Sequence, residues 1–235
     1  MTRPDTDDAV VRNSPANAIG EERILDAAYE LMLAIGMRRM TMADIGRRAR
    51  VSRATLYRRW PNVQAVVAAL VTREWSTIAT ASFQVAAESA ASFQVAADSQ
   101  VATGSAEERG SARHLLVEGI VSATRRSREH PLLRTIVNLD PEFLLPYLLQ
   151  RRGSSADEQL ELIETGLRAG HADGSIRPGD AAWQARALLL TALSFTLSGP
   201  IMAAPEEYPR LDDELRTLLD RYVSPDGHRN RGQPS

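Results

Sequence analysis

The stretch RRARVSRATLYRRWP, residues 47 to 61, gathers the side chains with the most readable chemistry. It holds six arginines, although the formal net charge of the chain is -2. A guanidinium group binds phosphate as a cation and pairs with guanine through two parallel hydrogen bonds. From Met37 to Trp60 there are eight arginines and one acid, Asp44, so this segment carries +7 and the remainder -9. The asymmetry indicates a surface that faces nucleic acid on an otherwise acidic body.

Two short helices joined by a tight turn would position these side chains. Thr41 can cap a first helix that ends near Arg50, with Asp44 three residues later as in a capping box. Ser52 can cap a second helix that runs through Arg59. This arrangement is the helix-turn-helix design, in which the second helix enters the major groove of DNA.

The expected second helix has distinct inner and outer faces. With Leu56 at the centre of the buried face, a turn of about 100° per residue places Trp60 about 40° away, where it helps to anchor the helix. The alternative to a DNA-binding role is that the two basic helices merely pack on the core of the protein. The outward face would carry a small residue for close approach, two hydroxyl groups and guanidinium groups: Arg53, Ala54, Thr55, Tyr57 and Arg58.

Helical periodicity continues along the chain and predicts an all-α protein. We expect a disordered arm over 1–20, a helix-turn-helix domain over 21–65, a helical body over 66–224 and a disordered tail over 225–235. Residues 81–99 form a near-perfect tandem repeat with a ten-residue period, which turns a helix about 80° short of three turns. The two copies therefore cannot present the same face, and the repeat is interpreted as a tolerant, partly helical connection.

Other functional classes find little support in the composition. The chain has no cysteine, no apolar leader and no apolar run long enough to span a bilayer, so a soluble cytoplasmic protein is expected. No phosphate-binding loop, dinucleotide fingerprint or H-E-x-x-H motif is present, and the four histidines are scattered. We therefore expect no catalytic residue, cofactor or metal site. A membrane-surface role would need an apolar face beside the arginines, which residues 53–59 lack.

Two late helices suggest self-association. The helix over 181–197 is apolar on nearly all sides, which places it centrally or at an interface. Two such helix pairs would form a four-helix homodimer interface. The alternative is that these leucines belong to the core of a single chain. The helix over 212–223 carries one apolar stripe: Leu211, Leu215, Leu218, Leu219 and Tyr222.

The run TMADIGRRARVSRATLYRRWPNVQAVVAAL, residues 41–70, resembles the TetR family of bacterial transcriptional regulators, with T-L-Y-R as its most specific part. The likeness covers about residues 21–75, and the remainder matches only in size and helical character, as is usual in the family. The run AGHADGSIRPGD, residues 169–180, resembles a connection before the dimer helices in actinobacterial members. It implies a repressor that binds a near-palindromic operator as a homodimer through the helices near 181–197 and 212–223. A small effector, expected to be lipophilic, would bind the body and release the DNA.

The resemblance also implies roles for individual residues. Thr41 and Tyr57 would contact phosphates, and Ala43 lies where some members contact a base. Ser52 begins the second helix, and Arg58 and Arg59 are the next candidates, with Arg59 closer to the scaffold. Base edges and the nearby backbone would be contacted by Arg53, Ala54 and Thr55.

Two positions depart from the family pattern. Many members have glycine at the position of Arg50. If the backbone there is left-handed, a residue other than glycine costs about 1 kcal/mol, and the guanidinium would add a phosphate contact in exchange. Many members have lysine at the position of Val63, so only the backbone and the helix dipole could hold a phosphate there.

The effector pocket has weaker candidates. Large side chains in short, proline-broken helices often line cavities. Each of the candidates could equally belong to the ordinary core. They are Trp75, His114, Phe143, Tyr147 and Trp183.

Overall fold

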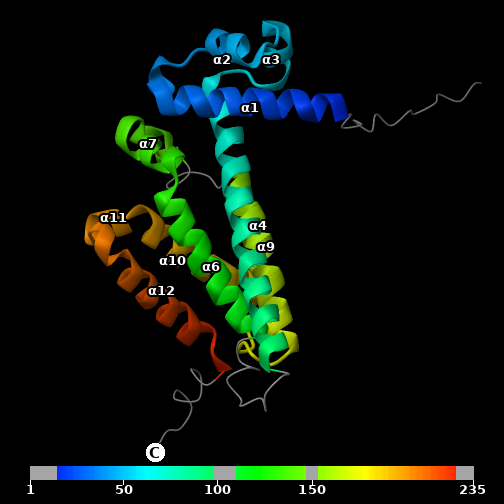
Figure 1. Ribbon diagram of the computed structural model, residues 1–235, viewed down its shortest axis with the longest axis vertical. Coiled ribbons are helices and arrows are strands. Elements are labelled where there is room, and N and C mark those ends of the chain that lie inside the picture. The colour runs from blue at the N-terminus through cyan, green and yellow to red at the C-terminus, as the bar shows by residue number, and fades with distance from the viewer. Residues whose placement is uncertain (1–14, 98–109, 147–152, 226–235) are drawn as a thin grey trace, which may run out of the picture. The chain divides into compact units, whose positions relative to one another are not determined.

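The computed structural model describes residues 15–97, 110–146 and 153–225, with side chains described only for 20–92 within the first range. These residues form helices and no strand, which confirms the all-α prediction (Figure 1). The chain divides into two compact units, Met1–Leu70 and Val71–Ser235. The sequence predicts the division five residues earlier, after residue 65. Among the described residues, no helix is long and apolar enough to cross a membrane.

The first unit contains three α-helices, a 3-10 turn and the start of a fourth α-helix. In chain order they are α1 (Pro15–Ile35), the 3-10 turn η1 (Met37–Arg39), α2 (Met42–Ala49), α3 (Arg53–Arg59) and the first turns of α4 (Val63–Ala97). The expectation of a disordered arm over 1–20 is wrong for residues 15–20, which are helical and belong to α1. Residues 1–14 lie outside the described part of the chain.

The core of the first unit holds the two short helices in place. Helix α1 packs on α2, and α2 packs on α3. Leu56 is completely buried and Trp60 nearly so, as the helical spacing predicts. The other most deeply buried side chains are Ile24, Ala28, Met32, Ile45, Val66, Val67 and Leu70.

The second unit is a helical body that begins with the remainder of α4. Helix α10 packs against α9 and α6, and α12 packs against α6. Asp180 caps α10 through hydrogen bonds from the N–H groups of Ala182 and Trp183, as predicted. The unit comprises α6 (Ala112–Glu129), α7 (Pro131–Leu139), η2 (Pro141–Phe143), α9 (Ser154–Ala172), α10 (Ala181–Leu197), α11 (Gly199–Met202), η3 (Pro205–Glu207) and α12 (Tyr208–Val223).

The tandem repeat is part of a long helix rather than a connection. Helix α4 continues to Ala97, so the described residues of the repeat are fully helical and not only in part, as the sequence suggests. The tolerance of the repeat to change stays a prediction. The different facing of the two copies is confirmed: Ser82 is completely buried, whereas Ser92, its equivalent, is exposed. Beside Ser82, the ring of Phe83 packs so closely on α6 that a Cβ at Gly119 would lie 2.6 Å from it.

A buried ion pair joins α6 to α12. The guanidinium of Arg128 donates to Asp212 Oδ1 at 2.8 Å, and both side chains are almost fully shielded from solvent. The same guanidinium lies 4.3 Å from the centre of the Tyr208 ring. Because a buried charge needs a partner of opposite sign, this pair ties the start of α12 to the end of α6.

Candidate nucleic-acid interface and internal cavity

Helix α2 begins with the predicted capping box. The N–H of Asp44 donates to Thr41 Oγ1 at 3.2 Å, and the N–H of Thr41 donates to the Asp44 carboxylate at 3.1 Å. The Thr41 hydroxyl also donates to this carboxylate, and that bond is the main cause of the lowered pKa of Asp44. Arg47 lowers the same pKa as a nearby cation. Thr41 thus starts the helix while its side chain stays exposed.

The turn between α2 and α3 has a left-handed backbone at Arg50. Its φ is 55° and its ψ is 44°, and it is the only non-glycine residue in the described ranges with a positive φ. The turn closes because the N–H of Val51 donates to the carbonyl of Gly46 at 3.0 Å. The left-handed backbone suspected from the sequence is therefore present, and for a residue other than glycine it is expected to cost about 1 kcal/mol.

Helix α3 presents the outward face that its spacing predicts. Ser52 Oγ accepts from the N–H of Thr55 at 3.1 Å and lies 2.9 Å from the Thr55 hydroxyl, so these two hydroxyls are already engaged with each other. Thr55 is half-buried as a result. The exposed residues of the helix proper are Arg53, Ala54, Tyr57, Arg58 and Arg59.

The arginines of this stretch divide into two groups. One group is held by acids of the same unit: Arg47 by Asp44, Arg48 by Glu30 and Arg59 by Glu21. The other group is exposed and, among the described residues, makes no ion pair or hydrogen bond through its side chains: Arg50, Arg53 and Arg58. The cations that remain available for a ligand therefore lie in the turn and on the outward face of α3.

The two remaining candidates lie at helix starts. Ala43 is half-buried in the first turn of α2. Val63 is half-buried as the first residue of α4. There the Asn62 side chain accepts from the N–H of Ala65 at 2.9 Å and caps the helix. Two N–H groups in this first turn, those of Val63 and Gln64, have no partner within the helix itself.

Comparison with known proteins agrees with this geometry. The family model described as bacterial regulatory proteins, tetR family, matches residues 24–70, which span α1 to the first turns of α4. Uncharacterized HTH-type transcriptional regulators of Mycobacterium tuberculosis and Mycobacterium bovis are 31% identical over 201 residues, which cover 86% of this chain and 93% of each relative. The chain belongs to the TetR family of transcriptional regulators. Helices α2 and α3 are its DNA-binding helix-turn-helix.

Several solved structures share the fold, among them two TetR-family repressors. The repressor AlkX from Dietzia has a TM-score of 0.60 at 21% identity, over 90% of this chain and 96% of that one. The repressor QsdR from R. erythropolis has a TM-score of 0.59 at 15% identity, over 86% and 95%. RolR in complex with resorcinol has a TM-score of 0.58 at 13% identity, over 94% and 98%. At these identities the likeness concerns the fold alone.

The second unit of this TetR-family chain holds a small internal cavity of about 40 Å³. Of the five predicted pocket residues, Trp75 lines it. Phe143 is buried elsewhere, and His114 is half-buried at the start of α6 without lining the cavity. Trp183 is 67% exposed, with the Arg186 guanidinium 4.6 Å from its ring centre. Tyr147 lies outside the described residues.

The structure thus does not bring the predicted pocket residues together. The role of the five residues in effector binding stays a prediction. The cavity lies between α4, α6, α9 and α10, which are unbroken where they enclose it, and not among the proline-broken helices on which the pocket prediction was based. Only hydroxyl groups on the otherwise apolar inner face of α6 could have indicated it from the sequence. Sequence reasoning missed the residues that define its two ends and its wall: Phe83, Thr124, Ser127, Gln159, Leu162 and Thr196.

Proposed function

We propose that this TetR-family regulator is a repressor that binds a near-palindromic operator as a homodimer and is released by a small effector. The observation that carries the DNA-binding part is the outward face of α3, where Arg53 and Arg58 are exposed without an ion-pair partner in the described chain. Leu56, on the opposite side, anchors the helix in the core. A cation without an internal partner is free to exchange water for a base edge or a phosphate.

The contacts on DNA follow from which groups are free. Arg53, in the first turn of α3, and Arg58 are the candidates for reading base edges, with Ala54 allowing close approach. Tyr57, whose side chain is 54% exposed, suits a phosphate. Arg59, a candidate from the sequence, is held by Glu21 and lies over the Trp60 ring, so its role is to support the scaffold.

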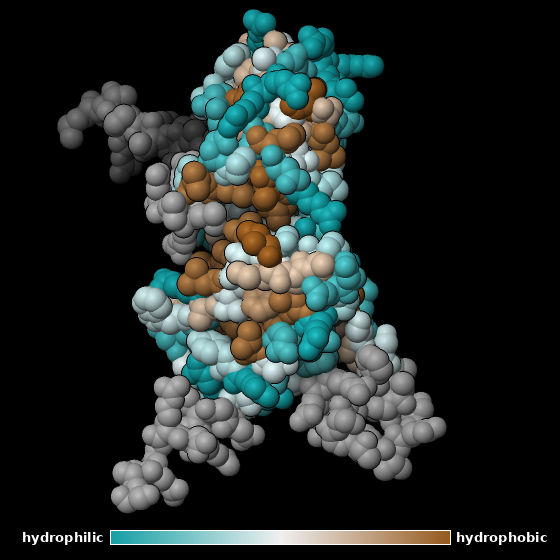
Figure 2. All heavy atoms as spheres, turned by 90° about the vertical axis from the view of Figure 1, so that its left-hand side faces the viewer, coloured by the Kyte–Doolittle hydropathy of each residue, from teal (hydrophilic) through white to brown (hydrophobic). Residues whose placement is uncertain are grey.

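A homodimer is supported by apolar side chains that the single chain leaves exposed. Figure 2 shows hydrophobic atoms at the surface on the side where α11 and α12 lie. The predicted stripe of α12 is divided: Leu215 and Leu219 are in the core, as the alternative proposed, whereas Leu218 is 52% exposed. Exposed apolar residues on the last three α-helices are Trp183, Leu190, Ile201, Met202, Leu218 and Tyr222. A twofold axis through α10 and α12 would cover such surfaces on both copies.

The DNA-binding part is tested with the purified protein and DNA from upstream of its own gene. We expect a gel shift at nanomolar protein concentrations that weakens steeply as salt rises, because binding releases counterions from phosphates. Unlabelled competitor DNA of random sequence should not abolish the shift. Equal competition by specific and random DNA would contradict the regulator function.

The dimer is tested by sedimentation of the Leu190→Arg variant. Leu190 is 67% exposed on α10, and a cation there would have to be buried in the interface, so we expect a shift to monomer. The matched control is Leu139→Arg on α7, where the leucine is 50% exposed and outside the proposed interface. If both variants stay dimeric, the interface lies elsewhere.

A further inference from the structure

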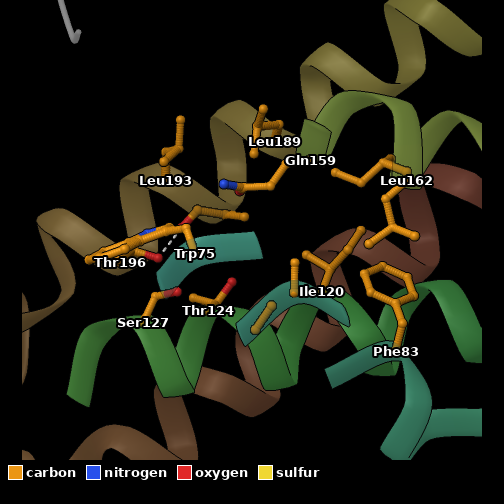
Figure 3. Close-up of a pocket in the computed structure, with 14 residues that line it drawn as sticks. Trp75, Phe83, Ile120, Thr124, Ser127, Gln159, Leu162, Leu189, Leu193 and Thr196 are labelled. Carbon is orange, nitrogen blue, oxygen red and sulfur yellow. Dashed lines mark hydrogen bonds between the residues drawn. The ribbon is translucent and has the colours of Figure 1, made fainter. Parts of the chain in front are cut away.

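The internal cavity has a polar end and an apolar end, and no ionisable side chain lines it. Figure 3 shows the hydroxyl groups of Thr124 and Ser127 from α6 near Thr196 from α10, with Phe83 at the opposite side. The remaining lining is Trp75, Ala79, Ile120, Ala123, Gln159, Leu162, Ile163, Leu189, Ala192 and Leu193. A site whose hydroxyl groups gather at one end orients an elongated, partly apolar molecule.

The hydroxyl groups at the polar end have unused hydrogen-bonding capacity. Thr124 Oγ1 is buried and has no hydrogen-bond partner. Ser127 makes no side-chain hydrogen bond to any described residue, and its side chain is buried as well. The Thr196 hydroxyl donates to the carbonyl of Ala192 at 2.9 Å and can still accept. Because buried hydroxyls are nearly always hydrogen-bonded, this end is built for a polar partner.

That partner is uncharged. A buried ionic head would need a counter-ion, since desolvation of an unpaired charge is strongly unfavourable. The buried cation of this unit, Arg128, is already paired with Asp212 and stacked on Tyr208, and it does not line the cavity. A hydroxyl or carbonyl head can instead exchange hydrogen bonds with Thr124 and Ser127.

The cavity as it stands is too small for such a molecule. Its volume is about 40 Å³, whereas a cavity that holds benzene measures about 150 Å³. An outer groove of about 290 Å³ lies between α4 and α9, and it shares Ala79, Gln159 and Leu162 with the cavity. These three residues therefore form the wall between the two spaces. Unlike the cavity, the groove is lined by two exposed carboxylates, Glu158 and Glu161.

Two of the wall residues can move. Gln159 and Leu162 lie one turn apart on α9 and are half-buried. The Gln159 amide makes no hydrogen bond to any described residue, and both side chains are long enough to change rotamer without moving the helix. If they turn away, the cavity and the groove become continuous.

We propose that the cavity and this groove form one binding site for an uncharged molecule with an apolar body and a single hydroxyl or carbonyl head. The head binds Thr124 and Ser127, the body lies along Phe83, and entry is by rotation of Gln159 and Leu162. The claim that this molecule is the effector rests on the proposed function. The claim that the site binds such a molecule rests only on the residues that line it.

The head-group chemistry is tested by calorimetric titration of the DNA-free protein with three probes of equal chain length. We expect saturable binding of 1-octanol that is at least about tenfold tighter than binding of octanoate or octylamine, because a charged head at the hydroxyl end of the cavity meets no counter-ion. The carboxylates of Glu158 and Glu161 lie in the exposed outer groove, away from the position of the head. Octanoate binding as tight as octanol, or no octanol binding, would overturn the assignment.

Matched variants test the residues. Thr124→Val keeps the shape and removes the hydroxyl, so octanol affinity should fall about fivefold. Thr77→Val makes the same change on an exposed part of α4 outside both spaces and should leave affinity unchanged. Gln159→Ala should speed octanol association in stopped-flow measurements by more than it changes affinity. Equal behaviour of Thr124→Val and Thr77→Val would refute the polar end, and an unchanged association rate would refute the entrance.

Operator binding separates this inference from the proposed function. Octanol that binds and also weakens the gel shift supports both. Octanol that binds without changing the gel shift supports the site and contradicts release by this effector. A specific gel shift from a protein that binds no octanol overturns the site while DNA binding stands.

Discussion

The two units use arginine in opposite ways. In the first, Arg50, Arg53 and Arg58 are exposed, and no acid among the described residues pairs with them. In the second, Arg128 is completely buried, paired with Asp212 and covered by the Tyr208 ring. Exposed ion pairs contribute little to stability, so unpaired surface arginines cost the fold almost nothing. A buried arginine without its acid would be strongly destabilising.

Under the proposed function, this difference distinguishes arginines that bind DNA from arginines that stabilise the fold. The stretch from 47 to 61 looks uniform as sequence, yet Arg47, Arg48 and Arg59 are held by acids and only the other three remain free. Changing an arginine that serves DNA should therefore alter binding without altering stability. Removing the acidic partner of a structural arginine should lower stability without directly altering DNA binding.

The largest expected effect is on stability, from Asp212→Ala. The variant leaves the buried Arg128 guanidinium without its acid, so we expect a loss of about 3–5 kcal/mol in the free energy of unfolding. Denaturant unfolding measures it. Asp213→Ala is the control, because Asp213 is exposed and pairs only at the surface with Arg216; its loss should stay below about 1 kcal/mol. Similar losses in the two variants would contradict the structural role of Arg128.

Next in size is the effect of Arg58→Ala on operator binding. We expect a loss of about 1–3 kcal/mol, concentrated at one or two base positions, with unchanged thermal stability. Gel shifts on a set of single-base operator variants measure it. Arg48→Ala, which removes a guanidinium held by Glu30, should cost less. A uniform loss across all operator sequences would instead assign Arg58 to a phosphate.

Arg50→Gly should change both the free energy of unfolding and the affinity for DNA, each by a smaller amount. Glycine accepts the left-handed backbone at this turn without a Cβ penalty, so we expect a gain of about 1 kcal/mol in the free energy of unfolding. If the guanidinium contacts a phosphate, the slope of log affinity against log salt should fall by about one. A variant that is no more stable would show that the turn stores no strain.

The helix-turn-helix was predictable because its signals are local. Thr41 and Ser52 cap helices through residues three positions away, and the outward face of α3 follows from its helical turn around Leu56. The pairing of Arg59 with Glu21 was not predictable, since 38 residues separate them. The position of Arg59 close to the scaffold could be inferred from its angle around the helix axis relative to Leu56. The identity of its partner, Glu21, could not be inferred in this way.

The cavity was not predictable, because four helices distant in sequence enclose it. Phe83 shows why: it belongs to the repeat, whose two copies look equivalent in sequence but differ in burial at Ser82 and Ser92. A ten-residue period rotates the second copy by about 80° relative to the first, which agrees with the burial of Ser82 and the exposure of Ser92. The contact of Phe83 with Gly119 of α6 is a tertiary contact that the repeat sequence does not encode.

The smallest expected effect concerns His130 of the second unit, whose neutral form is favoured by burial. Burial lowers the pKa of His130 below 6.5, partly opposed by Glu74, whose carboxylate lies 3.5 Å from Nε2. The unfolded chain therefore binds a proton at His130 more readily than the folded chain does. The contribution of His130 to the free energy of unfolding is complete above pH 6.5 and is lost as pH falls through the pKa of His130 in the folded chain. The His130 Nδ1 accepts from the N–H of Leu132 at 3.3 Å and caps α7, and protonation would remove this acceptor.

Unfolding measured at pH 7.5 and 5.5 should therefore show a smaller pH dependence in His130→Asn than in the unaltered protein. Asparagine keeps a side-chain acceptor for the cap but does not titrate, so the comparison isolates the proton from the hydrogen bond. The window lies above the range in which aspartates titrate, so Asp44, whose pKa is lowered further, does not contribute to the difference. An identical pH dependence in both proteins would mean that His130 is protonated as easily in the folded chain as in the unfolded one, and that burial beside Trp75 does not discriminate against its charge.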